Sequence, residues 1–255
     1  MQFRFINNVK DGIPNLLSLG IDEAIFSSVS SENTLPTIRL SRVSKSGVSV
    51  GFHQNINDEV NVDVCKKLGI VVSRRLTAGG AVFHDQEIVY SITLPIGTPI
   101  SPEDVKVSYE TICNGLVDGL QLLGIDAKFK PFNDVIVHNK KISGSAQTRR
   151  SGFLLQQGTI LMDVDVDKMF EILKVPKEKI KGKFIEEIKN SITSVRKELN
   201  RDISYIEVSE ALKQGFIDCW KAELIEDILT DREMKFAELT VKETFGNDDW
   251  NYSIS

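Results

Sequence analysis

The sequence has few cysteines and histidines, and they are scattered along its 255 residues. The three cysteines, Cys65, Cys113 and Cys219, are odd in number and lie far apart, at spacings that match no zinc-ligand motif. This use of cysteine indicates a reducing compartment rather than a disulfide-bonded secreted fold. The histidines are equally isolated, at His53, His84 and His138. We therefore expect neither a zinc site nor a prosthetic group.

Long apolar runs and a surplus of basic residues are also missing. Residues 1–19 contain no long apolar run, so we expect no signal peptide, no membrane span and a cytoplasmic location. The net charge is -5 and the pI is near 5.4. Proteins that bind nucleic acid without regard to its sequence normally carry a basic surplus. The sequence therefore predicts no nucleic-acid partner and no membrane partner.

The chain does have enough apolar sequence for a large core: 41% of its residues are hydrophobic. Periodicity predicts strands at 37–43, 47–52, 70–75, 88–94, 134–139, 140–147 and 152–164, with a hairpin turn at the Asn-Lys step between 134–139 and 140–147. It predicts helices around 20–29, 102–123, 165–175 and 208–220. Strands and helices follow one another without a regular βαβ alternation. This order favours an α+β fold in which helices pack on a mixed sheet.

Finer features of several elements can also be predicted. Tyr90 and Ser91 would point to opposite faces of a half-buried strand. Ser101 would cap the helix that follows, with Pro102 at its first position. The charged segment 178–190 is typical of a solvated helix or surface loop. Residues 231–255 are expected to form a helix followed by an exposed tail.

One candidate ligand-binding motif is "RRLTAGGAVFHD", residues 74–85. Gly79 and Gly80 allow backbone conformations that bring main-chain N–H groups close to a ligand. Those groups, together with Arg75 and the hydroxyl of Thr77, would suit a phosphate or a carboxylate. Taken alone, the motif is better explained as a Gly-Gly turn flanked by solvated arginines, because short glycine motifs are weak evidence.

A second candidate is "KKISGSAQTRR", residues 140–150, preceded by "FND" at 132–134. Small residues on a strand leave room for another molecule, and a lysine beside that room could hold a phosphate or polarise a carbonyl. The alternative for the first segment is a surface hairpin with a solvated lysine. Asn133 and Asp134 could bind a metal or a polar ligand at the start of a strand. The alternative for these two residues is a turn or a strand cap.

The order of these motifs, followed by "LLQQGTIL", resembles the lipoate–protein ligase family within the biotin/lipoate ligase and octanoyltransferase superfamily. The resemblance runs from "DEA" at 22–24 to "DDWN" at 248–251. It implies the fold of the biotin/lipoate protein ligase catalytic domain. It also implies that residues 1–255 are one such domain, with 231–255 as terminal helix and tail, in a short form without the C-terminal accessory domain.

The resemblance implies a two-step reaction in which lipoate and ATP form lipoyl-adenylate, from which a lysine of an acceptor protein takes the lipoyl group. Lipoate, ATP and Mg2+ would be substrates, and Lys141 would be the catalytic lysine that stabilises charge developing on oxygen. Residues implied near the lipoyl group are Glu23, Arg75, Thr77, Gly79, Gly80, Ala81, His84, Gly144, Ser145 and Ala146. Residues implied near ATP are Arg75, Asn133, Asp134, Lys141, Gly158 and Thr159, with Asp134 as a ligand of Mg2+.

The implied partners are lipoyl-domain acceptors, such as the E2 subunit of 2-oxoacid dehydrogenases or the glycine cleavage H protein, and a separate small accessory-domain protein. Two other functions stay open. One is octanoyl or lipoyl transfer from a carrier protein without ATP, favoured by "QEIV" after Asp85. The other is a non-catalytic homologue that binds lipoylated carriers. The cysteine-dependent transferases carry their nucleophile just before the lysine motif, where this chain reads "KFKPFNDVIV" without a cysteine.

Overall fold

Two β-sheets dominate the computed structural model, which describes residues 1–31, 34–174, 187 and 190–254. The strands are β1 (Gln2–Ile13), β2 (Thr37–Val43), β3 (Gly47–Val50), β4 (Val71–Arg74), β5 (Val82–His84), β6 (Glu87–Pro95), β7 (Ala127–Lys130), β8 (Asp134–Val137), β9 (Lys140–Arg150), β10 (Phe153–Leu161) and β11 (Glu223–Glu226). The large sheet has the order β11-β1-β2-β6-β10-β9-β8-β7, and the small one β4-β3-β5. In the large sheet β1 runs parallel to both of its neighbours, and the other adjacent pairs are antiparallel.

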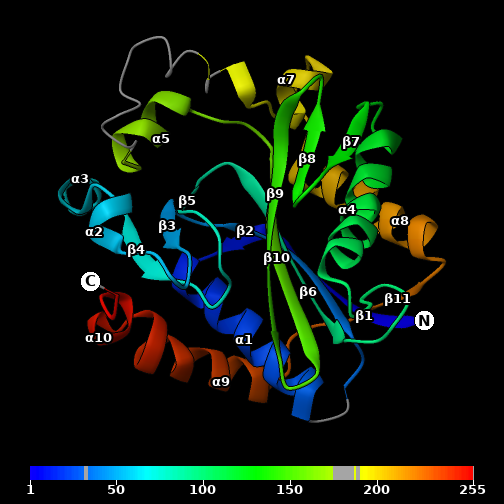
Figure 1. Ribbon diagram of the computed structural model, residues 1–255, viewed down its shortest axis with the longest axis horizontal. Coiled ribbons are helices and arrows are strands. Elements are labelled where there is room, and N and C mark those ends of the chain that lie inside the picture. The colour runs from blue at the N-terminus through cyan, green and yellow to red at the C-terminus, as the bar shows by residue number, and fades with distance from the viewer. Residues whose placement is uncertain (32–33, 175–186, 188–189, 255) are drawn as a thin grey trace.

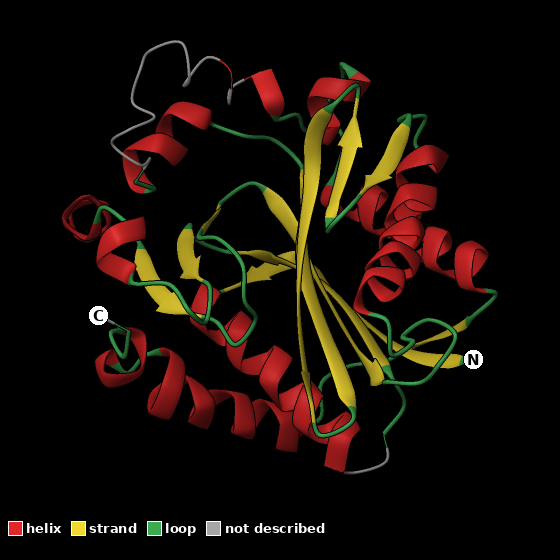
Figure 2. Cartoon of the chain, in the orientation of Figure 1, coloured by secondary structure: helices red, strands yellow, loops and turns green. Residues whose placement is uncertain are grey.

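Helices cover both faces of the large sheet (Figures 1 and 2). They are α1 (Asn15–Ser31), α2 (Ile56–Glu59), α3 (Val62–Leu68), α4 (Val105–Leu122), α5 (Val166–Ile172), α7 (Val195–Leu199), α8 (Tyr205–Trp220), α9 (Asp231–Thr240) and α10 (Asp248–Asn251), with a π-helix, η2, at Val241–Phe245. The main core lies between the sheet and α4 and α8, and a smaller one lies between β1, α1 and α9. This arrangement confirms the predicted α+β class.

Glycines allow α4 and α8 to cross closely on the face of the large sheet that these two helices cover. A Cβ atom at Gly215 would lie 2.2 Å from the backbone nitrogen of Gly119 and 2.5 Å from the carbonyl oxygen of Gly115. No larger residue fits that space without moving one helix. The close crossing lets buried α8 residues such as Phe216 reach the same core as α4.

The strand β6 is buried on both faces, so the predicted half-buried strand is wrong. Ser91 and Thr93 are 3% and 1% exposed, because α1 covers the face that alternation had assigned to solvent. The hydroxyl of Ser91 donates to Asp22 Oδ1 at 2.6 Å, and Arg39 Nη1 donates to the same oxygen at 2.7 Å. The polar face of β6 therefore meets a buried polar patch of α1 rather than water.

The structure also moves the start of the helix expected from residue 102. The helix α4 begins at Val105, and its N-cap is Asp104, whose Oδ1 accepts hydrogen bonds from the backbone nitrogens of Lys106 and Val107. A carboxylate that reaches two of the unpaired N–H groups of the first turn outcompetes the Ser101–Pro102 start that the sequence suggested.

The C-terminal segment is docked against the small sheet, so the expected exposed tail is wrong. Phe245 and Asn251 are 1% and 4% exposed. The Asn251 side-chain oxygen accepts from the backbone nitrogen of Arg74 at 2.8 Å, and Arg74 Nη2 donates to the carbonyl of Asn251 at 2.7 Å. Arg74 therefore anchors the end of the chain and is not available to a ligand. In the described part of the chain, each helix is too short or too polar to cross a membrane. Most of the segment 178–190 lies outside the described residues.

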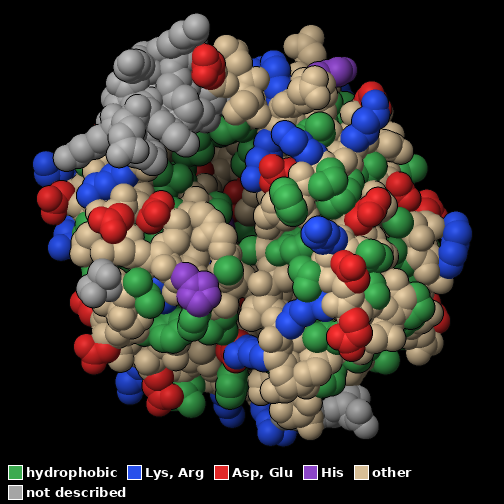
Figure 3. Space-filling view, viewed as in Figure 1, with side chains coloured by type: hydrophobic (Ala, Val, Ile, Leu, Met, Phe, Trp, Pro, Cys, Tyr) green, Lys and Arg blue, Asp and Glu red, His purple; other side chains and the backbone are tan. Residues whose placement is uncertain are grey.

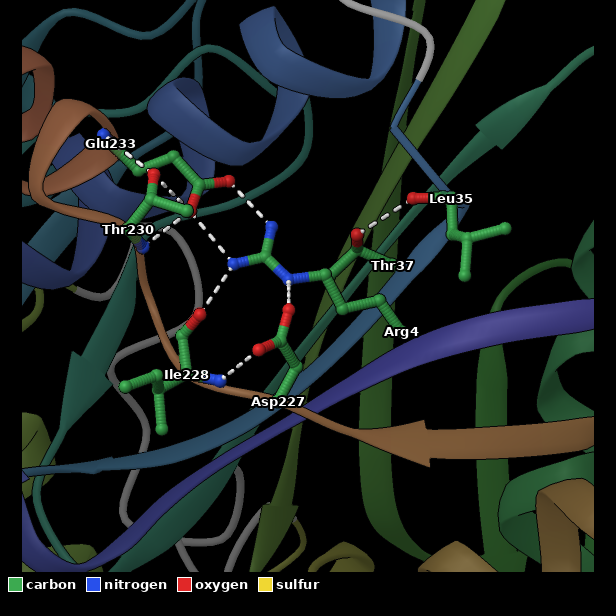
Figure 4. Close-up of polar contacts among 7 residues, drawn as sticks. All are labelled: Arg4, Leu35, Thr37, Asp227, Ile228, Thr230 and Glu233. Atoms are coloured by element: carbon green, nitrogen blue, oxygen red, sulfur yellow. Dashed lines mark hydrogen bonds and ion pairs between the residues drawn. The ribbon is translucent and has the colours of Figure 1, made fainter.

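A buried ion pair ties the first strand to the C-terminal helix (Figure 4). Arg4 Nη1 and Nη2 donate to the two carboxylate oxygens of Glu233 at 2.6 and 2.7 Å, and Arg4 Nε lies 2.7 Å from Asp227. Glu233 also accepts from Thr230, which caps α9 in a capping box. Burial works to raise the pKa of Glu233, but the hydrogen bonds and charge of Arg4 outweigh it and leave the pKa below its ordinary value of 4.5.

Candidate functional site

A cavity of about 320 Å³ lies between α1, the small sheet, α5 and the strands β9 and β10. The molecular surface is hollowed between the side that carries the small sheet and the side that carries β9 and β10 (Figure 3). Its larger apolar lining residues come from α1, β5, β6, β10 and α5 and from two positions outside these elements. They are Leu19, Val82, Phe83, Val89, Leu161 and Met169, and then Leu173 and Ile192. We call this cavity the first pocket, and its size and mixed lining are typical of small-molecule sites.

Lys141 lies on the wall of the first pocket at the start of β9. Its side chain crosses Gly144, where an added Cβ atom would fall 2.6 Å from both Cε and Nζ. The Nζ atom lies 2.6 Å from Asp134 Oδ1, and the two side chains are 45% and 27% exposed. A cation held in this way, partly open to the pocket, can stabilise negative charge that develops on a bound oxygen atom.

Asn133 and Ser145 fix the small-residue strand beside Lys141. Asn133 Nδ2 donates to the carbonyl of Ser145 at 2.5 Å, and the backbone nitrogen of Ser145 donates to the carbonyl of Asn133 at 3.0 Å. The Ser145 hydroxyl lies 2.6 Å from the Tyr90 hydroxyl, on the core side of the sheet. Ser145 therefore offers the pocket its backbone, while its side chain is engaged behind the strand.

The glycine motif forms a loop whose shape is set by Arg75. The guanidinium of Arg75 donates to the carbonyls of Ala78 and Gly80 at 2.7 and 2.9 Å, to Thr77 Oγ1 at 3.0 Å and to the carbonyl of Ser49 at 3.1 Å. Burial lowers the pKa of Arg75 to about 10, so it stays a cation at neutral pH. Gly79 turns the loop with φ of +99°. The loop is thus built around an internal arginine, which differs from both interpretations of the sequence.

A hydrogen-bonded chain links this loop to α1 across β10. Gln157 Nε2 donates to Asp22 Oδ2 at 2.6 Å, and Thr77 Oγ1 donates to Gln157 Oε1 at 3.1 Å. Gln157 therefore joins the buried carboxylate of Asp22 to the loop that Arg75 holds. Neither Asp22 nor Gln157 was predicted as a site residue. The helical spacing of Asn15, Ser18, Leu19 and Asp22, which together line the pocket, was the signal in the sequence.

His84 also lines the first pocket, within a buried polar chain. Its Nε2 lies 2.8 Å from the hydroxyl of Ser49, and its Nδ1 contacts a carboxylate oxygen of Glu87. Ser49, His84 and Glu87 come from β3, β5 and β6, so this chain joins the small sheet to the large one. Ser49 and Glu87 were not predicted as site residues.

The structure brings most of the predicted residues together around the first pocket. Those that line it are Arg75, Gly79, Gly80, Ala81, His84, Asn133, Lys141, Gly144, Ser145, Ala146, Gly158 and Thr159. Thr77 and Asp134 stand behind this lining and contact Gln157 and Lys141. Glu23 does not line the first pocket, and its carboxylate pairs with Arg150 at the end of β9. Burial raises the pKa of Glu23, the hydrogen bond from Arg150 opposes this rise, and the net direction is upward.

No metal cluster accompanies these residues in the part of the chain that the structure describes. No group of three or more His, Cys, Asp or Glu side chains lies close enough there to hold an ion. Asp134, expected as a Mg2+ ligand, is bonded to Lys141. The cysteines do not line the first pocket, and Cys113 is buried in α4 behind the sheet, with its pKa raised to about 11 by burial.

Comparison with known proteins identifies relatives over the whole chain. Residues 15–217 match the family model described as the lipoyl protein ligase A/B catalytic domain. Octanoyltransferase LipM of Brevibacillus brevis is 32% identical, and that of Clostridioides difficile is 30% identical; each alignment covers 98% of this chain and 98% of the relative. Among solved structures, the bipartite lipoate protein ligase of Thermoplasma acidophilum has a TM-score of 0.88 at 30% identity, covering 100% of this chain and 98% of its own. A lipoate-protein ligase A solved with ATP has a TM-score of 0.84 at 28% identity, with full coverage of both chains.

These relatives correct the expected reaction. The sequence resemblance implied an ATP-dependent lipoate–protein ligase, yet the Brevibacillus and Clostridioides relatives are octanoyltransferases. The stretch "QEIV" after Asp85, which favours transfer from a carrier protein without ATP, agrees with these relatives. The fold and the superfamily are as expected. With a family model that spans residues 15–217 and relatives that align over nearly the whole chain, the protein belongs to the lipoyl protein ligase A/B catalytic domain family.

Proposed function

We propose that the protein is an octanoyltransferase that moves an octanoyl group from the thioester of an acyl carrier protein to a lysine amine of a lipoyl-domain acceptor, without ATP. The observation that carries this proposal is the 30–32% identity to octanoyltransferases over 98% of the chain. The first pocket supports it, because a cavity with apolar side chains and Lys141 on its wall suits an aliphatic acyl chain with a reacting carbonyl.

In this proposal the acceptor amine attacks the thioester carbonyl beside Lys141. The ammonium of Lys141 stabilises the oxyanion of the tetrahedral intermediate. Asp134, 2.6 Å from that ammonium, is placed to accept the proton that the attacking amine loses. The carbon–sulfur bond then breaks, an amide remains on the acceptor, and the thiolate of the carrier takes up the proton.

The transfer is proposed to be direct, without an acyl group on a cysteine of this chain. All three cysteines lie in described residues, and none lines the first pocket. Cys113 has no exposed surface, and a nucleophilic cysteine needs an accessible thiolate of low pKa, whereas burial raises this pKa to about 11.

Replacement of Cys113 by alanine tests the direct route. We expect octanoyl transfer to change by no more than a few-fold, because the thiol only packs near Ser145 in the core. Loss of a covalent nucleophile instead costs on the order of 10³-fold or more. Steady-state rates, together with a thermal unfolding control, distinguish these results, and a collapse of the rate in a folded variant would exclude direct transfer.

A second substitution tests the loop of the first pocket. Gln157→Met removes both hydrogen bonds of Gln157 at similar volume, so we expect the loop around Arg75 to loosen and KM for the octanoyl donor to rise about tenfold, with a smaller change in kcat. Thr77→Val, which breaks the same chain, is the matched variant. The double variant should be no worse than either single one, because both act through one network. Additive losses would show that the two residues act independently.

The function itself is tested by two reaction mixtures. One contains the octanoyl thioester of an acyl carrier protein and a lipoyl domain; the other contains free octanoate, ATP, Mg2+ and the same domain. We expect mass spectrometry to find the octanoyl-lysine product in the first mixture. Product in the second mixture alone would overturn the proposal.

The acceptor and the domain organisation are also parts of the proposal. Lipoyl domains of the 2-oxoacid dehydrogenase or glycine cleavage type are the proposed acceptors, supported by the archaeal lipoylation system of Thermoplasma acidophilum, which consists of the bipartite ligase and its E2 lipoyl domain. Residues 1–255 are proposed to act as one catalytic domain. The docking of residues 245–251 on the strand that leads to Arg75 supports this, because both ends of the chain then belong to one folded unit.

A further inference from the structure

A second cavity, of about 500 Å³, lies beside the first pocket at the far end of β9. On one side it is lined by Phe52 and His53 and by Leu76 and Ala78 of the glycine motif. On the other side it is lined by the last four residues of β9, 147–150. Ala78, the residue before Gly79, therefore faces this cavity. The proposed transfer step at Lys141 takes place outside it.

The second cavity contains a guanidinium that forms no direct ion pair with a described carboxylate. Arg149 donates to the carbonyls of Glu103 and Pro102 at 2.7 and 3.1 Å and to the hydroxyl of Ser108 at 2.6 Å, and all three acceptors are uncharged. Among the described residues, no carboxylate forms an ion pair with Arg149. Arg150 beside it is paired with Glu23. The exposed carboxylate of Asp104 at the start of α4 acts on Arg149 electrostatically but forms no ion pair with it. The Arg149 guanidinium is thus open to a direct ionic partner, which favours an anionic ligand.

The two arginines also keep unused hydrogen-bond donors. The Nε atoms of Arg149 and Arg150 are buried and have no hydrogen-bond partner among the described residues. A guanidinium presents five N–H donors in a planar fork, and this fork matches the oxygens of a phosphate. Gln147 and Thr148, which line the same cavity, add an amide and a hydroxyl. The cavity thus offers both charge and directed donors.

The two cavities are neighbours along one strand. Ala146 lines the first pocket, and Gln147, the next residue, lines the second. Gly79 marks the boundary, because a Cβ atom there would lie 3.8 Å from the Cβ of Ala146. A ligand that extends from the first pocket along β9 therefore reaches the end of the strand that carries Arg149, whose guanidinium lies toward α4, where it contacts Ser108.

The spacing matches one part of the proposed donor. Lys141 lies across Gly144, which is five residues from Arg149, or about 17 Å along an extended strand. A phosphopantetheine arm has roughly thirteen bonds between its sulfur and its phosphorus, or about 15 Å at the extension of a peptide backbone. With its thioester carbonyl at Lys141, such an arm places its phosphate at the second cavity.

We infer that the second cavity binds the phosphate of the phosphopantetheine arm that carries the acyl group, with Arg149 as the main contact. This inference rests on the proposed function, since it assumes a thioester donor. It assigns the two cavities separate roles: the first holds the acyl chain and the reacting carbonyl, and the second recognises the arm by its charge.

The test compares two thioester donors, each with the wild-type protein and with the Arg149→Gln variant. Octanoyl-phosphopantetheine and octanoyl-pantetheine differ by the phosphate alone, so neither involves the surface of a carrier protein. We expect the wild type to prefer the phosphorylated donor by about tenfold or more in kcat/KM, and we expect Arg149→Gln to lose that preference while using octanoyl-pantetheine as the wild type does. Lys106→Gln, which removes an exposed positive charge on α4, is the matched control and should keep the preference.

Three other outcomes of the kinetic comparison overturn the inference. A wild type that uses both donors equally has no phosphate site, and an Arg149→Gln variant that keeps the preference places the site elsewhere. Equal losses on both donors give Arg149 a structural role. If neither thioester reacts, the proposed function fails, and calorimetric titration with phosphopantetheine decides the inference separately. Binding that Arg149→Gln abolishes supports the site, and an absence of binding to the wild type removes it.

Discussion

Replacement of Lys141 by alanine is expected to lower kcat/KM for octanoyl transfer by about 100- to 1000-fold. The variant loses the cation beside the reacting carbonyl, so the oxyanion forms without its main stabilising group. It also leaves Asp134 without the ammonium group 2.6 Å away. Because the Lys141 side chain is 45% exposed, its removal should leave the fold intact.

Lys140→Ala is the matched control for Lys141. The two lysines are adjacent on β9, but Lys140 does not line the first pocket. We expect this control to retain most of the transfer rate and the same thermal unfolding midpoint. Near-normal octanoylation of a lipoyl domain by folded Lys141→Ala would show that the chemistry takes place elsewhere.

Replacement of Arg4 by methionine is expected to lower the free energy of unfolding by about 3–5 kcal/mol. The variant leaves the carboxylate of Glu233 buried without its cation, since the Glu233 side chain is only 1% exposed. Chemical denaturation at neutral pH measures the loss. The double variant Arg4→Met/Glu233→Leu removes the stranded charge as well, and it should recover much of the stability. No recovery would show that packing, rather than charge, dominates at this site.

The same pair makes stability depend on pH in a defined direction. The pKa of Glu233 in the folded protein lies below its ordinary value of 4.5, so the unfolded chain takes up a proton first as the pH falls. The stability due to the pair is fully present above pH 4.5 and is lost as the pH falls through the folded pKa. Denaturation curves recorded from pH 7 to acid should show a shallower decline for the double variant than for the wild type.

The class of the fold and many of its elements were predictable from the sequence, but the strands β1, β5, β7 and β11 were not, and neither was the way in which the elements are buried. The alternating pattern of β6 identified a strand, yet alternation cannot show that α1 brings Asp22 to meet Ser91. The pattern at the end of the chain gave a helix, yet it could not show that Asn251 accepts a hydrogen bond from Arg74, 177 residues away. Both errors involve polar residues whose partners are distant in sequence.

Site residues were predictable where they stand in a segment that resembles a family motif and that the resemblance links to a role. Lys141, Asn133 and the glycines were identified because their segments resemble family motifs, and the structure gathers them around one pocket. Asp22 and Gln157 stand in the stretches "DEA" and "LLQQGTIL", but the resemblance gave neither residue a role, and Ser49 belongs to no motif. Only the folded arrangement places these three residues at the site. The choice between ligase and transferase could not be made from Lys141, because a cation at the reacting carbonyl suits both reactions.

The position of β1 in the sheet has a consequence for the order of folding. Gln2 pairs with Glu223, a separation of 221 residues, so one edge of β1 stays open until more than four-fifths of the chain is available. Contacts of such long range close slowly, because the entropy of a large loop is lost before the contact stabilises anything. During synthesis, one edge of β1 therefore stays unpaired until β11 is made. The side chains of Phe3 and Phe5 likewise stay exposed until α8 packs against them. A nascent chain stalled before residue 223 would expose a strand edge that can pair with other chains.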